Sequence, residues 1–303
     1  MLGAALQSPL PTIIVSIDNQ DEAVRSLVRE CSREFKVDLL VVSRPWPNEV
    51  RVGQVRNNGV KALLSTIDAP DKAGKDLVYF LDGDSVAPPG LIAHAEQLAR
   101  GADLLVGGRI CLTQSQTDAF SEPDLRVGKP PVVLGDDQLR ERASRHNRYL
   151  WQTRLKPFGF VKPHKPKVLG ASHGVSLGMY RQVNGYDESF LGAWREDDDF
   201  GRRVYLAGGT CRVAVEDLCV YHLWHALNPM KRENWTELAE RKQKSADASC
   251  VQGLDAPRPQ ADLLVEHVAK GRTARETIIP QSTAPDAAAG LSSRAAPVAS
   301  AGL

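Results

Sequence analysis

Two aspartates, Asp82 and Asp84, flank a glycine directly after the apolar run LVYFL at residues 77–81. Gly83 has no side chain and lets the backbone turn, so that both carboxylates can reach one ligand. Paired carboxylate oxygens suit Mg²⁺ or Mn²⁺, which proteins usually bind together with substrate phosphates. A solvated turn after a strand explains an isolated pair equally well. Other parts of the chain must therefore decide between the two explanations.

The run FLDGDSV also matches the nucleophile motif of haloacid-dehalogenase-like phosphatases. In that chemistry Asp82 would attack phosphorus and Asp84 would act as acid and base. That class places the motif near the first strand of its domain, whereas strand and helix patterns at 12–35 and 37–67 precede it here. The class also needs a downstream acidic pair at the end of a strand. The phosphatase interpretation is therefore kept as an alternative.

A second acidic group, residues 196–199, stands within the segment NGYDESFLGAWREDDDFGRRVYLAGG at residues 184–209. Carboxylates in the first turn of a helix are favoured by the helix macrodipole, which explains such a run without any function. Here the acids follow a glycine-containing loop and a tryptophan, in the same chain as the first acidic pair. This combination favours a functional role.

The two acidic groups together resemble those of glycosyltransferases of the GT-A fold, particularly family 2 and the galactosyltransferase C-terminal module. The resemblance covers residues 12–229 and rests mainly on the pattern N-G-[FY]-D-E-x-[FY]-x-G-W-x-x-E-D-x-D-[LF], while VRNNGVKAL at 55–63 is similar to a helix motif of that family. It implies metal-dependent, inverting transfer of a sugar from a nucleotide-sugar, such as a UDP- or GDP-sugar. The acceptor would be a hydroxyl of a glycan, lipid-linked or small-molecule acceptor. A non-catalytic, sugar-binding GT-A domain is a further alternative.

The resemblance assigns the two acidic groups separate tasks. Asp82 and Asp84 would hold Mn²⁺, or Mg²⁺, against the donor diphosphate. Asp197 would be the general base that takes the proton of the acceptor hydroxyl, and Glu196 and Asp198 would line the acceptor site. In this fold a histidine after the last core strand often completes the metal shell. The candidates, of which the first is favoured, are His222 and His225.

Donor-binding residues follow from the same resemblance, because ligands of such folds lie at the carboxyl ends of the strands. The loop GASHGVS at residues 170–176 corresponds to the acceptor and donor-sugar loop of the family. The expected donor-binding residues are Ser16, Asp18, Ser43, Arg56, Asn57, Asp82, Gly83, Gly174 and Trp194.

The elements that must position these residues alternate between strands and helices. Apolar, partly β-branched runs at 12–17, 37–43 and 76–82 predict strands, and helical spacing of apolar residues predicts helices between them. Such alternation predicts an α/β fold with parallel strands. The resemblance narrows this expectation to the GT-A fold, a three-layer α/β/α sandwich with a central, mostly parallel sheet.

Prolines and composition divide the chain. Residues 113–168 are expected to form an irregular, basic insertion on the acceptor side, with one helix at 136–155. The sequence beyond 253 is rich in Pro, Ala, Ser and Gly, with one possible short helix at 261–271. The expected parts are an N-terminal leader at 1–11, the GT-A domain at 12–230, a C-terminal helix at 231–252 and a low-complexity, largely disordered tail at 253–303.

Composition limits the partners and the location. The 303 residues are 42% hydrophobic and 25% charged, as in ordinary globular proteins, and the net charge of +1 gives no long-range attraction for nucleic acid. The sequence has five cysteines without C-x-x-C spacing, no signal peptide and no apolar stretch of about 18 residues. These features predict a cytoplasmic protein without a transmembrane segment, either soluble or peripheral at the inner face of the membrane. Residues 128–167 carry ten basic and three acidic side chains with interleaved aromatic residues, which could meet a sugar or an anionic lipid-linked acceptor. The oligomeric state is left open.

Overall fold

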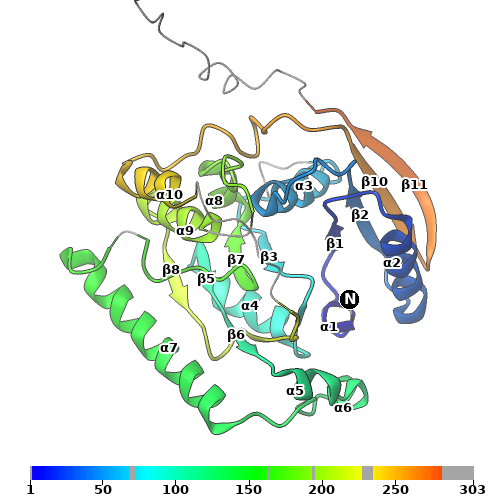
Figure 1. Cartoon of the computed structure of the whole chain (residues 1–303), viewed down its shortest axis with the longest axis horizontal. Helices are drawn as coiled ribbons and strands as arrows, with labels where there is room; N and C mark the ends of the chain where they lie inside the picture. The colour runs from blue at the N-terminus through cyan, green and yellow to red at the C-terminus, as the bar shows by residue number, and fades with distance from the viewer. Residues whose placement is uncertain (1, 69–72, 163, 193–194, 227–234, 282–303) are drawn as a thin grey trace, which may run out of the picture.

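The chain folds into three β-sheets with surrounding helices, which confirms the expected α/β class (Figure 1). The computed structural model describes residues 2–68, 73–162, 164–192, 195–226 and 235–281.

The first sheet joins the two ends of the described chain. Strands β1 (Ile13–Ser16) and β2 (Leu39–Ser43) are parallel and are connected by helix α2 (Glu22–Phe35). Strand β10 (Leu263–Ala269) pairs antiparallel with β2, and β11 (Arg272–Ile279) pairs antiparallel with β10. In Figure 1 the β10–β11 hairpin forms the outer edge of the molecule beside α2.

The hairpin corrects two expectations. The short helix expected at 261–271 is wrong, because residues 263–269 form a strand on the free edge of β2. The apolar residues Leu263, Val265 and Val268 fit helical spacing, but ladder bonds and burial against β2 outweigh that local pattern. The tail expected to be largely disordered from residue 253 is folded as far as Gln281, and the remainder lies outside the described residues.

A buried ion pair fastens the hairpin to α2. Glu266 of β10 is almost fully buried, and its two carboxylate oxygens accept hydrogen bonds from Arg25 (2.5 Å) and Arg29 (2.9 Å). Burial alone would raise the pKa of Glu266, but the hydrogen bond and charge of Arg25, together with Thr273 and Arg29, outweigh burial and the pKa is lowered. The hairpin is therefore held by side chains as well as by the β2 ladder.

The second and third sheets carry the central part of the chain. The second sheet contains, in spatial order, β3 (Leu77–Leu81), β7 (Ser172–Ser176), β5 (Leu104–Val106) and β8 (Cys211–Val213). The third contains, in spatial order, β4 (Ser85–Val86), β9 (Cys219–His222) and β6 (Gly108–Cys111).

A single central, mostly parallel sheet is not what the described strands form. Five strand pairs are antiparallel and three are parallel. The main reason is β7, which follows the long segment 113–168 and returns between β3 and β5, antiparallel to both. Strands joined by a single crossover helix pair in parallel, but β7 is not joined to β3 or β5 in that way.

Helices pack on these sheets and cover the core. Helix α3 packs on β1 and β2, α4 on β5 and β7, α8 on β7, and α10 on α9. The helices outside the insertion are α1 (Leu2–Ala5), α2, α3 (Val52–Leu64), α4 (Leu91–Ala99), α8 (Leu177–Gln182), α9 (Glu196–Leu206) and α10 (Trp235–Lys244).

The segment 113–168 is more helical than its prolines suggest. It contains α5 (Gln114–Asp118), α6 (Glu122–Arg126), α7 (Asp136–Leu155) and the short 3₁₀ helix η1 (Lys156–Phe158). The helix predicted at 136–155 is confirmed by α7, which packs on β6 and β8. None of the described helices is both long enough and apolar enough to span a bilayer.

Candidate active site

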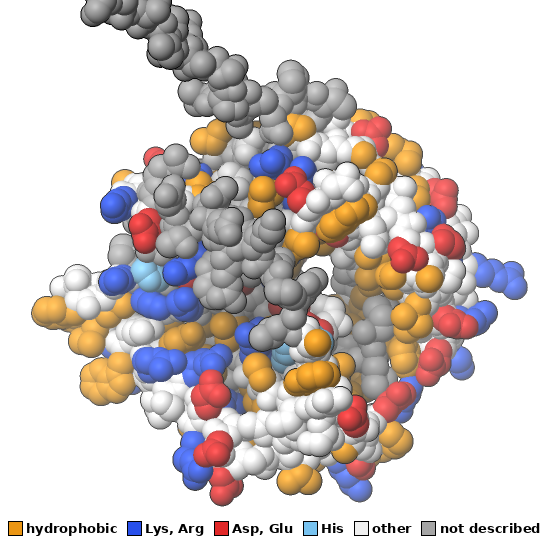
Figure 2. All heavy atoms as spheres, viewed as in Figure 1, with side chains coloured by type: hydrophobic (Ala, Val, Ile, Leu, Met, Phe, Trp, Pro, Cys, Tyr) orange, Lys and Arg blue, Asp and Glu red, His pale blue; other side chains and the backbone are white. Residues whose placement is uncertain are grey.

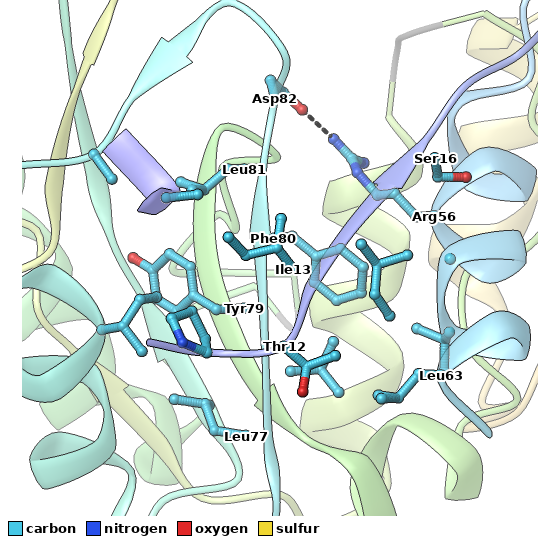
Figure 3. A pocket seen from close by; sticks show the side chains of 18 of the residues that line it. Thr12, Ile13, Ser16, Arg56, Leu63, Leu77, Tyr79, Phe80, Leu81 and Asp82 are labelled. Carbon is cyan, nitrogen blue, oxygen red and sulfur yellow. Dashed lines mark hydrogen bonds and ion pairs between the residues drawn. The ribbon is translucent and has the colours of Figure 1, made fainter. Parts of the chain in front are cut away.

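Arg56 of α3 links the two acidic groups that the sequence singles out. Its Nη2 donates to Asp82 Oδ1 at 2.9 Å, and its Nη1 donates to Asp197 Oδ1 at 2.7 Å. The same Nη1 lies 3.4 Å from Glu196 Oε1. Figure 3 shows Arg56 and Asp82 pointing toward each other from α3 and the end of β3. One buried guanidinium therefore stands among three carboxylates.

Asp197 is held by three donors from different parts of the fold. Besides Arg56, the Gly170 amide donates to Asp197 Oδ2 at 3.0 Å and the Tyr186 hydroxyl donates to Oδ1 at 3.1 Å. The Tyr186 hydroxyl also lies 2.9 Å from His173 Nε2. Because a tyrosine hydroxyl has one proton, it can serve only one of these two acceptors at a time. The orientation of Asp197 is thus coupled to a buried imidazole.

The imidazole of His173 is neutral. Burial, and next the charge of Arg56, lower the pKa of His173 to about 3. Its Nδ1 lies 3.0 Å from the Leu169 carbonyl oxygen, so Nδ1 carries the proton and Nε2 is left to accept from Tyr186. The ring also stacks on Phe80 with centroids 4.9 Å apart. The aromatic side chains of Phe80 and Tyr186 therefore pack around His173 next to the acidic site.

The electrostatics of the site favour the protonated forms of Glu196 and Asp197. Burial, and next the charge of Asp197, raise the pKa of Glu196. Burial also raises the pKa of Asp197, and the charge of Asp82 adds to that rise while Arg56 opposes it. Burial disfavours the charge of Arg56, but Asp197 and the other acids outweigh it and raise its pKa. A single cation is thus shared by acids that repel one another.

The remaining acids of the α9 run have other partners. Asp198 Oδ2 accepts from Lys167 Nζ at 2.9 Å and lies 3.5 Å from Arg195 Nη1. Asp199 is buried and binds the guanidinium groups of its own helix at 3.0 Å (Arg202) and 2.7 Å (Arg203). Asp199 is therefore a structural residue, whereas Asp198 lies near the basic segment that precedes β7.

A second cluster brings together three of the predicted metal ligands. Asp84 Oδ2 lies 3.4 Å from His222 Nε2 and 3.2 Å from His225 Nε2, and one potential ligand atom from each residue lies within 4.8 Å of the others. Pairing of β4 with β9 sets this arrangement, because Ser85 is opposite His222 and the Leu223 amide donates to the Asp84 carbonyl at 2.9 Å. One carboxylate and two imidazoles fit a divalent transition metal such as Mn²⁺.

Asp82, also predicted as a metal ligand, is not part of that cluster. Its carboxylate binds Arg56, while Asp84 faces the histidines. Gly83 lies between them in an open turn, where an added Cβ would meet no atom within 4 Å. The turn thus directs the two carboxylates to different partners rather than to one ion.

A cleft of about 1840 Å³ extends from this turn between β1, α3 and β3. Figure 3 shows its polar end at Asp82 and Arg56 and its largely apolar wall, to which Ile13, Leu77 and Phe80 belong. Strands β1 and β3 are each the edge strand of their sheet, and both line the cleft. Five of the residues predicted to bind the donor also line it: Ser16, Asp18, Arg56, Asp82 and Gly83.

Two of these lining residues are already engaged. The Ser16 hydroxyl donates to the Val55 carbonyl oxygen at 2.7 Å. Asp18 Oδ1 accepts from Arg44 Nε at 3.1 Å, and its Oδ2 accepts from the Arg51 amide at 3.3 Å. A ligand at this end of the cleft must share or replace these bonds.

Asn57 and Gly174, predicted to bind the donor, serve the core instead. Asn57 is fully buried and uses all four hydrogen-bonding positions of its amide: Nδ2 donates to the Tyr186 carbonyl oxygen and to Glu188, while Oδ1 accepts from the Tyr180 hydroxyl and the Tyr186 amide. Gly174 lies inside β7, paired with β3 and β5, where an added Cβ would approach Leu77 to 2.9 Å. Neither residue is free to contact a nucleotide.

The other two donor-binding candidates give no site contact. Ser43 is buried at the end of β2, and its hydroxyl has no hydrogen-bond partner in the described part of the chain. Trp194 lies outside the described residues.

A scan against models of known protein families finds no match for this chain, and a search of curated protein sequences finds none that is significantly similar.

Tyr186, a residue of the site, is not among those predicted from the sequence, whereas Gly170 opens the loop 170–176 that the resemblance assigns to the acceptor and the donor sugar. Tyr186 follows Asn184 and Gly185, whose φ angles of 58° and 63° form a left-handed turn that directs the tyrosine inward. An asparagine–glycine pair is a recognisable signal for such a turn. At Gly170 a side chain would collide with Arg56 and Asp197, so only glycine lets the amide reach the carboxylate.

Proposed function

We propose that this protein is a metal-dependent, inverting glycosyltransferase with a GT-A-type fold, which transfers a sugar from a nucleotide-sugar to a hydroxyl acceptor. The observation that carries the proposal is the turn Asp82–Gly83–Asp84. The turn directs Asp84 toward the two imidazoles of His222 and His225. It directs Asp82 toward Arg56, which also binds Asp197. The turn would thus connect a candidate metal-binding group with a separate candidate base. Sugar transfer from a diphosphate donor needs both.

The donor diphosphate would lie at the turn. A divalent ion held by Asp84, His222 and His225 would neutralise the charge that develops on the leaving diphosphate. Arg56, which already faces the cleft, would add a fixed positive charge there. The large cleft between β1 and β3 supports this placement, because a nucleotide-sugar needs a long, partly apolar site.

Asp197 would take the proton of the acceptor hydroxyl. The Gly170 amide fixes its carboxylate, and the Tyr186 hydroxyl can donate either to it or to His173, so little reorganisation would be needed in the transition state. Arg56 is the only one of the three donors that carries charge, and it opposes the rise in the pKa of Asp197 that burial causes. Attack from the face opposite the diphosphate would invert the anomeric centre. The expected acceptors are glycan, lipid-linked or small-molecule hydroxyl groups.

The decisive experiment is a thermal-shift screen of UDP-, GDP- and dTDP-sugars with and without Mn²⁺. We expect one nucleotide class to raise the melting temperature only when Mn²⁺ is present, since the ion bridges protein and diphosphate. Asp84→Asn should remove the shift, and the exposed Asp136→Asn should keep it. If no nucleotide-sugar stabilises the protein with either Mn²⁺ or Mg²⁺, the proposal fails.

The phosphatase alternative makes a different prediction. A haloacid-dehalogenase-like enzyme would form an aspartyl phosphate at Asp82 and hydrolyse a generic phosphomonoester without any nucleotide-sugar. Mass spectrometry of the acid-quenched protein separates the two functions. We expect no phosphorylation at Asp82, because its carboxylate is bound to Arg56.

A further inference from the structure

Positive charge is concentrated in one short part of the chain. Residues 142–167 contain eight Lys or Arg side chains and no Asp or Glu. Since the whole chain has a net charge of +1, the other residues together carry a charge of 1 − 8 = −7. The basic segment is therefore a local feature of an otherwise acidic protein, and it covers the second half of α7, η1 and the loop toward β7.

Side chains on the outer side of this segment form a mixed basic and apolar surface, the α7 face. Along α7 its members recur every three or four residues, as expected for one side of a helix. The apolar members are largely exposed, with exposed fractions of 59% for Trp151, 71% for Phe158 and 79% for Phe160. The α7 face consists of Arg148, Trp151, Arg154, Leu155, Phe158 and Phe160.

The opposite side of the helix is already used for packing. Tyr149 is buried in the main hydrophobic cluster, and Leu150 packs against that cluster. On the α7 face, Arg154 lies over the Trp151 ring at 5.8 Å, and neither Arg148 nor Arg154 forms an ion pair with a described acidic residue. Figure 2 shows basic and hydrophobic side chains mixed on this side of the molecule. Nothing in the described chain covers the α7 face.

We propose that the α7 face binds the surface of an anionic phospholipid bilayer. Basic side chains are attracted to the negative headgroups, and aromatic side chains favour the boundary between headgroups and acyl chains. A soluble polyanion would use the arginines but would leave the two exposed phenylalanines and Leu155 in water. Arginines that form no ion pair with a described acidic residue, combined with exposed apolar side chains, fit a membrane surface better.

The basic segment continues beyond the α7 face to Lys167, whose Nζ contacts Asp198 at 2.9 Å, next to Asp197. The membrane proposal stands independently of sugar transfer, because it concerns binding alone.

The test is flotation of the full-length protein with vesicles of phosphatidylcholine, with or without phosphatidylglycerol. We expect binding only to the anionic vesicles and a loss of binding at high salt. Each arginine near the surface contributes about fivefold to partitioning, so the double variant Arg148→Gln/Arg154→Gln should bind roughly 25-fold more weakly. Phe158→Ser/Phe160→Ser should weaken binding by about tenfold or more, since the apolar contact is lost.

Control variants replace a basic and an apolar residue that lie outside the α7 face. Arg33→Gln and Val251→Ser alter exposed residues, with Arg33 on α2 across the molecule from α7, and should bind like the unaltered protein (Figure 1). Nitroxide-labelled lipids should quench part of the tryptophan fluorescence, and Trp151→Phe should remove that part. Equal binding to neutral vesicles, or unchanged binding of both double variants, overturns the proposal. So does tighter retention on heparin with no effect of the phenylalanine changes, which would indicate a soluble polyanion.

Discussion

Arg56 donates a hydrogen bond of 2.7 Å to the carboxylate of Asp197. The same guanidinium binds Asp82, at the end of the strand that leads to the metal-type cluster. In the proposed function, Arg56 would lie between the donor diphosphate and the base Asp197. An arriving diphosphate would then compete with Asp197 for Arg56, and the pKa of Asp197 would rise.

Replacing Arg56 should shift the pH dependence of the reaction. Arg56 lowers the pKa of Asp197, so Arg56→Gln should move the rising, acidic limb of the rate profile to higher pH. The measurement is initial rate against pH with saturating nucleotide-sugar. Arg140→Gln, on the exposed part of α7, is the control and should leave the limb in place. An unshifted limb in Arg56→Gln would show that Asp197 is not the titrating base.

Glu196 should make the folded state sensitive to alkaline pH. Burial raises its pKa above that of the unfolded chain, so the folded state binds this proton more tightly. The stabilising effect is complete below the ordinary glutamate pKa of about 4.3 and is lost as pH rises through the raised value. Glu196→Gln, which stays neutral, should be about 1 kcal/mol more stable than the unaltered protein above that value. Urea unfolding at several pH values tests this, with exposed Glu141→Gln as the control.

Replacing Asp197 and replacing Asp84 should have different effects on sugar transfer and on nucleotide binding. Asp197→Asn should reduce transfer at least about 100-fold, because the acceptor proton loses its base, while Mn²⁺-dependent nucleotide binding stays nearly intact. Asp84→Asn should lose both, since it removes a metal ligand. Product formation and calorimetric nucleotide binding separate the two effects. Equal loss of nucleotide binding in both variants would refute the base assignment.

The two histidines should control metal affinity. His222→Ala and His225→Ala should each weaken Mn²⁺ binding by about tenfold or more, because each removes one of three protein ligands. Binding can be followed by the loss of the free Mn²⁺ signal in electron paramagnetic resonance. His94→Ala on the exposed side of α4 is the matched control. Unchanged affinity in both site variants would exclude the cluster as the metal site.

Asn57 should affect stability rather than donor affinity. Its buried amide satisfies four polar partners, so Asn57→Ala leaves several of them without hydrogen bonds and should cost about 2–4 kcal/mol. Urea unfolding measures the loss, and Asn147→Ala on the exposed part of α7 should cost little. If the folded fraction of Asn57→Ala binds nucleotide-sugar much more weakly, Asn57 has a role in donor binding after all.

The sequence predicted correctly those features that depend on short stretches of chain, such as helical spacing and the ends of strands. The bounds of α7 follow from its own helical spacing, and Asp84, His222 and His225 meet because strand ends carry them to one place. The division of labour within the Asp82–Gly83–Asp84 turn could not be predicted, because it depends on Arg56, which comes from another element.

Contacts between distant segments account for the main errors. Asn57 is polar and follows Arg56 in a motif-like run, yet its environment is created by residues 180–188, so the sequence could not distinguish a ligand-binding amide from a buried one. Likewise β7 is antiparallel because a long insertion brings it back, and Leu263–Ala269 is a strand because β2 has a free edge.

The β10–β11 hairpin also determines when the molecule can finish folding during synthesis. The Arg25–Glu266 contact joins residues 241 positions apart, so β2 must wait for nearly the whole chain to leave the ribosome before its outer edge is paired. Until then the nascent N-terminal segment presents an unpaired, valine-rich edge, the kind of surface that recruits other strands. A chaperone that shields β2 during translation would therefore act on the stage at which this protein is most prone to misassembly.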